Sequence, residues 1–186
     1  MIKIGILGDI GSGKSYVANN FGYPVFNADA EVSKLYKKNT KIFHKLKKTL
    51  PKFFQNFPIK KNEVSKAIFD NQNNLKKIIK IVHLEIRKKM LSFLSKNKNA
   101  EIVILDVPLL LENKINKEND ILVFVQSKKK DILKRLRKRK NYNQKLINLF
   151  RNIQISPKYK KNKSQFVIKN DFTKRTIKRY IKTIVS

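Results

Sequence analysis

Short apolar runs, some of them alternating with polar residues, mark five segments of the chain that have the length of β-strands. Runs of this length, bounded by glycine, proline or polar residues, are typical of strands whose side chains are largely buried. The sequence therefore predicts strands at Ile2–Leu7, Pro24–Asn27, Ile102–Asp106, Ile121–Gln126 and Phe166–Lys169.

Between these segments, apolar residues recur every three or four positions, which is the spacing of an amphipathic helix. Most of the predicted strands run into turn or polar residues before such a pattern begins. The alternation favours an α/β fold in which a five-stranded parallel sheet is flanked by helices. Helices are predicted at Lys14–Phe21, Glu31–Lys38, Lys41–Leu50, Asn62–Phe69, Asn74–Ser95, Lys130–Lys138, Gln144–Ile153 and Thr173–Ile184.

The predicted strands are unevenly spaced. A long interval between the second and third strands is nearly all helical in pattern, and a long basic interval separates the last two. The chain has no internal repeat and no glycine- or proline-rich linker, so we interpret both intervals as insertions within one domain. The prediction for the 186 residues is a core of 1–29, 101–127 and 164–186, a helical insert at 30–100 and a basic lid at 128–163.

The composition agrees with a globular chain. Hydrophobic residues make up 41% of the sequence and charged residues 31%, which allows a buried core. The longest apolar runs are far shorter than the roughly 20 residues of a membrane-spanning helix. The chain has no cysteine, which excludes disulfides and thiolate metal ligands. Because the first predicted strand starts at residue 2, no targeting segment is expected, and the expected compartment is the cytoplasm.

The net charge of +31 raises the question of a nucleic-acid partner. Seven of the 44 basic residues are arginine, and the lysines are spread along the chain instead of clustering with aromatic residues. Lysine, asparagine and isoleucine have AT-rich codons, so base composition accounts for much of the excess charge. The sequence therefore predicts no specific nucleic-acid partner, although weak attraction to polyanions is expected at low salt.

The first predicted strand runs directly into Gly8–Ser15, which fits the phosphate-loop pattern GxxxxGK[ST] at every defined position. Glycines let successive backbone N–H groups turn toward a phosphate, and the positive end of the next helix points at the same group. In such a loop, Lys14 reaches the β- and γ-phosphate oxygens and the Ser15 hydroxyl binds Mg²⁺. The alternative is a glycine-rich turn that matches by chance, which the strand–loop–helix context disfavours. The residues predicted to bind the nucleotide here are Gly11, Ser12, Gly13, Lys14, Ser15 and Tyr16.

The residues after the second and third predicted strands favour a phosphotransferase over a switch GTPase. A GTPase carries DxxG after its third strand, whereas Asp106–Leu109 lacks the glycine, and Asn116–Asn119 lacks the aspartate of a guanine-binding NKxD. A phosphotransferase needs a base close to the γ-phosphate. Asp29 follows the second strand, at the sheet edge where the phosphate loop is expected. We interpret Asp29 as this base, with a helix N-cap as its alternative role.

Five short motifs follow one another through the whole chain: Gly8–Ser15, Asn27–Asp29, Val82–Arg87, Asp106–Glu112 and Val167–Asn170. They are similar in turn to GGIGSGKS, DAD, IHPx[IV]R, DxPLL[FL]E and VIDN. In these motifs, and in its lid arginines and late glutamine, the chain resembles the dephospho-CoA kinase family. The phosphate loop alone is generic, but together with the histidine and PLLxE motifs it is specific. The lid residues concerned are Arg135, Arg137, Arg139 and Gln154.

The resemblance implies transfer of the γ-phosphate of ATP to the 3′-hydroxyl of dephospho-CoA, with Asp29 as the catalytic carboxylate. It implies a Mg²⁺ ion held by Ser15 and Asp106, and a strand-end cap is the alternative role of Asp106. Arg137 or Arg139 is expected to meet the transferred phosphoryl group, while most other lid arginines form a solvated basic face. Asn170 joins the predicted ATP-binding residues. The residues implied in acceptor binding are His83, Arg87, Pro108, Leu109 and Glu112.

Asp9 stands where the second glycine of the family motif is usual, and three further positions depart from the pattern: Asn27 replaces an aspartate, Leu84 a proline and Lys169 an acidic residue. None of them changes the loop lysine, the loop serine or Asp29, so activity is expected. Two other functions stay open from the residues: a P-loop kinase of another small acceptor, such as a nucleoside monophosphate, and a nucleic-acid-binding protein regulated by ATP. A monomer is expected.

Overall fold

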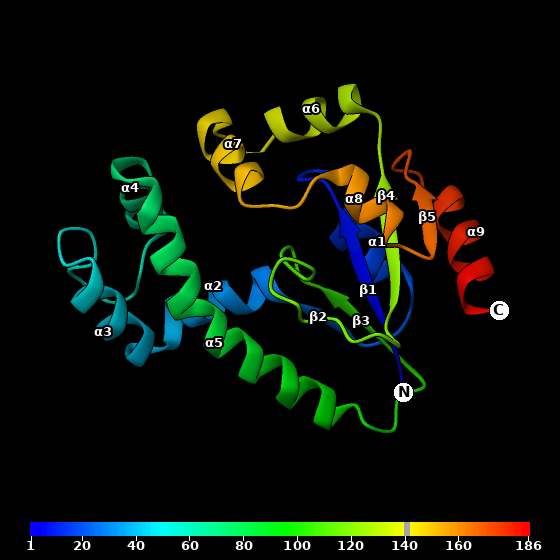
Figure 1. Cartoon of the computed structure of the whole chain (residues 1–186), viewed down its shortest axis with the longest axis horizontal. Helices are drawn as coiled ribbons and strands as arrows, with labels where there is room; N and C mark the ends of the chain where they lie inside the picture. The colour runs from blue at the N-terminus through cyan, green and yellow to red at the C-terminus, as the bar shows by residue number, and fades with distance from the viewer. Residues whose placement is uncertain (140–141) are drawn as a thin grey trace. The chain divides into compact units, whose positions relative to one another are not determined.

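The computed structural model of the chain describes residues 1–139 and 142–186. Within the predicted lid, residues 140 and 141 lie outside the described part. The chain divides into two compact units, one formed by Met1–Asn27 with Asn97–Ser186 and the other by Ala28–Lys96. We call them the sheet unit and the helical unit and describe each by itself, with the element labels of Figure 1.

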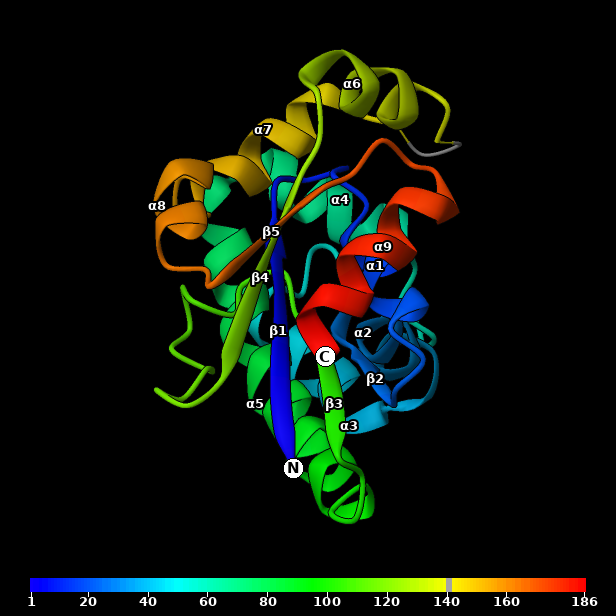
Figure 2. The same ribbon diagram turned by 90° about the vertical axis from the view of Figure 1, so that its right-hand side faces the viewer.

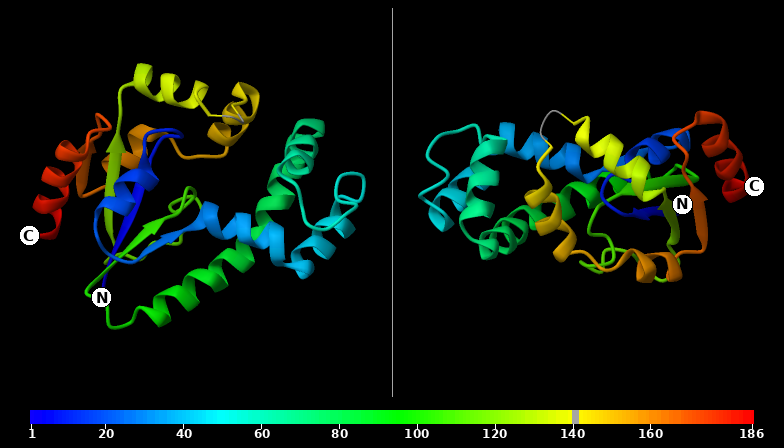
Figure 3. Two further views of the ribbon diagram at one scale, coloured as in Figure 1. Left: turned by 180° about the vertical axis from the view of Figure 1, so that it is seen from behind. Right: turned by 90° about the horizontal axis from the view of Figure 1, so that it is seen from above.

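The sheet unit contains a five-stranded sheet in the order β2-β3-β1-β4-β5, and every neighbouring pair is parallel. The carboxyl ends of the strands therefore lie at the same edge of the sheet, as the arrows in Figures 1 and 3 show. This confirms the predicted parallel sheet, and each strand lies within a residue of its predicted bounds. The strands are β1 (Ile2–Gly8), β2 (Val25–Asn27), β3 (Ile102–Asp106), β4 (Ile121–Gln126) and β5 (Phe166–Lys169).

The helices of the sheet unit include one that the apolar pattern did not predict. This helix, α8 (Pro157–Asn162), has the sequence PKYKKN, without any apolar periodicity. Its start is nevertheless marked by a proline at the first helical turn and by the Ser156 side chain, which accepts a hydrogen bond from the Tyr159 N–H. The other helices of this unit are α1 (Lys14–Asn20), α6 (Lys129–Arg137), α7 (Gln144–Asn152) and α9 (Lys174–Val185).

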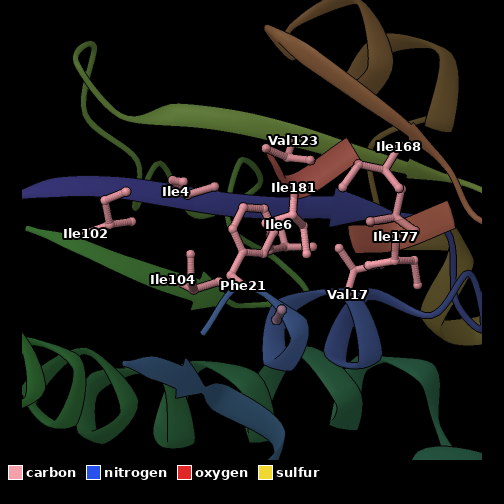
Figure 4. Close-up of a cluster of buried hydrophobic side chains, with 12 residues drawn as sticks. Ile4, Ile6, Val17, Phe21, Ile102, Ile104, Val123, Ile168, Ile177 and Ile181 are labelled. Carbon is pink, nitrogen blue, oxygen red and sulfur yellow. The ribbon is translucent and has the colours of Figure 1, made fainter. Parts of the chain in front are cut away.

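The core of the sheet unit is an aliphatic layer between the sheet and the helices α1 and α9 (Figure 4). Val17 of α1, Phe21 directly after this helix and Ile177 of α9 are buried against Ile6 and its neighbours on the strands. Figure 2 shows α8 on the opposite side of the sheet from these two helices. Burial of this face fixes α1 against β1, so the loop between them has two rigid supports.

The helical unit contains α2 (Ala28–Lys38), α3 (Thr40–Thr49), α4 (Lys61–Asp70) and α5 (Gln72–Lys96). The helices enclose an apolar centre of their own. Its buried residues include Leu35, Ile42, Leu46, Phe54, Ile68, Leu75, Ile78 and Val82. The helix α2 begins at Ala28, three residues before its predicted start. Asp29 therefore lies inside the first turn of α2, and the alternative interpretation of Asp29 as an N-cap is wrong.

Candidate active site

The phosphate loop joins β1 to α1 through backbone conformations that favour glycine. Gly11 and Gly13 have φ angles of 85° and 93°, in the left-handed region. Gly13 is the N-cap of α1, and a Cβ atom there would lie 3.0 Å from the Phe172 ring. The loop glycines are therefore required by both the turn and the close approach of neighbouring segments.

Lys14 folds back over the loop that precedes it. Its Nζ donates hydrogen bonds to the carbonyl oxygens of Gly8, at 3.1 Å, and Asp9, at 2.9 Å. Ser15 and Tyr16 are exposed on the first turn of α1. The ammonium group and the helix N-terminus therefore belong to one compact anion-binding loop.

Two side chains that directly follow β4 and β5 brace this loop. The Ser12 carbonyl oxygen accepts hydrogen bonds from Ser127 Oγ, at 2.9 Å, and from Asn170 Nδ2, at 2.8 Å. Asn170 is 4% exposed, and its Oδ1 accepts the Phe172 N–H. The structure thus places Asn170 as a support of the phosphate loop, a role that the sequence did not indicate.

The carboxyl ends of β2 and β3 hold an amide–carboxylate pair. Asn27 lies opposite Asp106 in the strand register, and its Nδ2 donates to Asp106 Oδ2 at 2.6 Å. Asp106 is 3% exposed. A second carboxylate in place of Asn27 would face Asp106 with the same charge. Asn27, which stands where the family pattern has an aspartate, therefore avoids this repulsion and donates a hydrogen bond to Asp106 instead.

The residues of this edge fit a magnesium ion bound together with a nucleotide. No group of three or more His, Cys, Asp or Glu residues suited to a metal occurs among residues 1–139 and 142–186. Mg²⁺ at a nucleotide is usually bound by one or two protein oxygen ligands, together with phosphates and waters. Ser15 lies in the first turn of the helix after the loop, and Asp106 ends the strand that neighbours β1. These two oxygen donors suit that kind of site.

The turn after β3 is tied to α8 by a buried ion pair, and to the chain just before α8 by a hydrogen bond. Glu112 Oε1 lies 2.8 Å from Lys160 Nζ and accepts the Ile155 N–H at 2.9 Å. Lys160 is 2% exposed and also donates to Gln154 Oε1 at 3.1 Å. Glu112, which the family resemblance associates with the acceptor, thus also anchors α8. Pro108 and Leu109, at the start of the same turn, are partly exposed.

The lid arginines differ in what they contact. The Arg135 guanidinium lies 4.1 Å from the centre of the Phe172 ring, a cation–π distance. Arg137 and Arg139 are exposed. Arg151 of α7 instead reaches the phosphate loop, where its Nη2 lies 3.3 Å from Asp9 Oδ2. Sequence reasoning missed Arg151, because nothing in the local pattern distinguishes it from the other basic residues of this segment.

Three predicted site residues belong to the helical unit. Asp29 is exposed in the first turn of α2, and His83 and Arg87 lie one turn apart on α5. Burial, and then the positive charge of Arg87, lower the pKa of His83 from its ordinary value. The buried Nε2 of His83 has no hydrogen-bond partner in the described part of the chain. His83 is therefore a neutral imidazole at pH 7, and Arg87 supplies the positive charge.

A parallel five-stranded sheet with this loop between its first strand and helix defines the P-loop nucleotide-binding fold, and solved structures of kinases share it. A Thermus thermophilus crystal structure matches with a TM-score of 0.80 and 26% identity, over 99% of this chain and 96% of that one. A Campylobacter jejuni dephospho-CoA kinase matches with a TM-score of 0.61 and 21% identity, over 98% and 95%. A Bacteroides thetaiotaomicron shikimate kinase, at 0.54 and 13% over 98% and 96%, has the same fold.

The sequence comparisons define the family within this class. The family model for dephospho-CoA kinase matches residues 2–175. The dephospho-CoA kinase of the Wolbachia of Brugia malayi is 33% identical, and that of Wolbachia pipientis wMel is 34% identical. Each match covers 98% of this chain and 95% of the relative. The chain belongs to the dephospho-CoA kinase family, whose members transfer the γ-phosphate of ATP to the 3′-hydroxyl of dephospho-CoA.

The comparisons confirm the predicted family, the kinase class and the two substrates. Among the described residues, no helix has the length and apolarity needed to cross a membrane.

Proposed function

We propose that this chain phosphorylates the 3′-hydroxyl of dephospho-CoA with Mg²⁺-bound ATP seated in the phosphate loop, and with Asp29 as the base. The observation that carries this proposal is the braced loop, in which Lys14 already lies over the carbonyl oxygens of Gly8 and Asp9. Such a cradle is suited to positioning and charge neutralisation, which supply most of the catalysis in phosphoryl transfer.

On the ATP side, Lys14 would exchange loop carbonyl oxygens for phosphate oxygens, which carry more negative charge. Ser15 and Asp106 would hold Mg²⁺, directly or through water, and the bound ion supplies neutralisation of the phosphate charge. Asn170 and Ser127 keep the loop backbone in place through the Ser12 carbonyl. The two interactions prevent the loop from relaxing when the phosphate charge redistributes during transfer.

On the acceptor side, Asp29 would orient the ribose hydroxyl and take its proton as the bond to the leaving ADP breaks. Asp29 lies two positions after Asn27 in the chain, and the Cα atoms of such a pair are at most about 7 Å apart. Asn27 in turn contacts Asp106 at the carboxyl edge of the sheet. The chain itself therefore keeps the Cα atom of Asp29 within about 7 Å of that of Asn27, the last residue of β2.

His83 and Arg87 are proposed to bind anionic groups of dephospho-CoA. Replacing both with alanine should raise KM for dephospho-CoA by on the order of tenfold or more, because a charge-assisted hydrogen bond and a neutral one are lost. KM for ATP should change little, since the phosphate loop belongs to the other unit. Initial rates with each substrate varied in turn measure both constants.

The matched control is the His44→Ala, Lys48→Ala pair, which removes a histidine and a basic side chain one turn apart on α3. It should leave both KM values unchanged. Arg87→Ala alone should raise KM for dephospho-CoA more than His83→Ala alone, because the lowered pKa of His83 leaves it uncharged at pH 7. A double variant whose KM rises for ATP instead would contradict this placement of the acceptor.

The high positive charge suggests a second candidate function, which is binding to nucleic acid. We expect binding to a single-stranded oligouridine RNA to disappear by physiological salt, because purely electrostatic binding weakens steeply as salt rises. Phosphorylation of dephospho-CoA should continue at the same salt. Fluorescence anisotropy and the kinase assay, run over one salt series, measure the two activities. Salt-resistant, sequence-dependent RNA binding carried by residues 128–163, without phosphorylation of dephospho-CoA, would support the nucleic-acid function instead.

The Mg²⁺ requirement has a direct test in the dependence of kcat on added Mg²⁺.

Arg137 and Arg139 stay predicted contacts of the transferred phosphoryl group, and Arg151 joins them because it lies at the loop. The cytoplasmic compartment and the monomeric state stay predictions from the sequence.

A further inference from the structure

The phosphate loop of this chain contains a carboxylate, Asp9, which accepts hydrogen bonds from a backbone N–H group and from an arginine side chain. Its Oδ1 accepts the backbone N–H of Ile10 at 2.6 Å and Arg151 Nε at 3.4 Å. Its Oδ2 accepts Arg151 Nη2 at 3.3 Å. The Asp9 side chain is 27% exposed and the Arg151 side chain 35% exposed. The contact is thus a half-exposed, two-pronged ion pair between the loop and α7.

The partners of Asp9 are the kinds of group that bind phosphate in P-loop kinases. Backbone N–H groups of the loop and arginine side chains hold phosphate oxygens in such sites. The Asp9 carboxylate supplies two acceptor oxygens to them. It also places a negative charge in a loop whose lysine, Lys14, lies over the neighbouring carbonyl oxygens. The family motif that the chain resembles has glycine at this position, so Asp9 is a departure from that motif.

We propose that the Asp9 carboxylate competes with the nucleotide phosphates for the Ile10 N–H and the Arg151 side chain. This competition weakens the binding of both ATP and ADP. Half-exposed ion pairs of this kind are weak, so a polyphosphate can displace the carboxylate. Arg151 then passes from Asp9 to the phosphates, and Asp9 turns toward solvent. The remaining repulsion between Asp9 and the bound phosphates lowers affinity and favours release of ADP. The inference rests on the proposed seat of ATP in the phosphate loop.

The Asp9→Asn variant tests this competition, because asparagine keeps the shape of the side chain and removes its charge. Dissociation constants for ATP and ADP, measured by titration calorimetry without acceptor, should each fall by about tenfold at the intermediate dielectric of a half-exposed site. Asp9→Gly should tighten binding in the same direction. Thermal unfolding establishes that both variants are folded. Unchanged or weaker nucleotide binding by the folded variants would overturn the inference.

The matched control is Glu118→Gln, which makes the same change in net charge on an exposed side chain before β4, at the amino ends of the strands. It should leave both dissociation constants unchanged. Equal tightening by Glu118→Gln and Asp9→Asn would mean that overall charge, and not the loop carboxylate, sets the affinity. That result would also overturn the inference.

Arg151 provides an independent arm of the test. Arg151→Ala removes the cation that passes to the phosphates, so the dissociation constant for ATP should rise by on the order of tenfold. In the Arg151→Ala background, Asp9→Asn should tighten ATP binding by clearly less than the tenfold expected in the wild type, because no arginine remains to be released from the carboxylate. Independent, additive effects of the two changes would contradict a working contact between them. A wild-type chain that bound no ATP would instead overturn the proposed function itself.

Discussion

Lys14→Ala is expected to lower kcat by on the order of 10²- to 10³-fold, which is the typical loss when one donor to developing charge is removed. Lys14 is the cation that the phosphate loop itself provides, and its Nζ lies within 3.1 Å of two loop carbonyl oxygens. Alanine at this position keeps the helix α1 but removes the charge next to the β- and γ-phosphates. Steady-state formation of ADP with dephospho-CoA as acceptor measures the loss.

The control for this variant is Lys178→Ala, on the exposed face of α9. It removes the same charge from the same unit, away from the loop, and should leave kcat unchanged. Equal melting temperatures of wild type and Lys14→Ala would separate lost catalysis from lost folding. Near-normal turnover by the folded Lys14→Ala variant would refute the assignment of the phosphate loop.

Asp29→Asn is expected to lower kcat by on the order of 10²-fold or more, as the loss of a general base does. Asparagine keeps the size of the side chain and loses the proton acceptor and the negative charge. Because Asp29 lies in the first turn of α2 and not in the phosphate loop, the dissociation constant for ATP should stay close to that of the wild type. Rapid-quench measurement of phosphoryl transfer, together with ATP titration, separates the two quantities.

Glu31→Gln is the matched control, because Glu31 is the other carboxylate in the first turn of α2. Its expected kcat is that of the wild type. A kcat within a few-fold of wild type for Asp29→Asn would mean that Asp29 is not the base. The buried Asp106 at the end of β3 would then be the next carboxylate to replace.

The strands could be predicted from the sequence because their apolar runs are short, continuous and bounded by turn residues. The longer helices were predicted from their apolar periodicity. The helix α8 was not, since its six residues bury a lysine instead of an apolar stripe. The start of α2 was placed three residues late, because the helix follows β2 without a loop and no turn residue separates them.

The candidate site likewise has local features, which the sequence predicts, and long-range contacts, which it does not. The loop motif is local, and its glycines have the positive φ angles that the pattern implies. The contacts that hold the loop join residues far apart in the sequence, such as Asn170 with Ser12 and Arg151 with Asp9. No spacing rule pairs such residues, because only the strand order brings β5 and the lid segment to the loop. Asn27 is similar, since its contact with Asp106 follows from the register of β2 and β3.

The most direct test of the central claim is to identify the product that the wild-type chain forms from ATP and dephospho-CoA. Mass spectrometry and ³¹P NMR of the reaction mixture should show one phosphoryl group added per acceptor, as a monoester on the ribose 3′-hydroxyl, with one ADP formed for each. Adenosine monophosphate, offered as the acceptor under the same conditions, should give far less ADP. Phosphorylation of adenosine monophosphate in preference to dephospho-CoA, or phosphate attached anywhere other than the 3′-hydroxyl, would contradict the account.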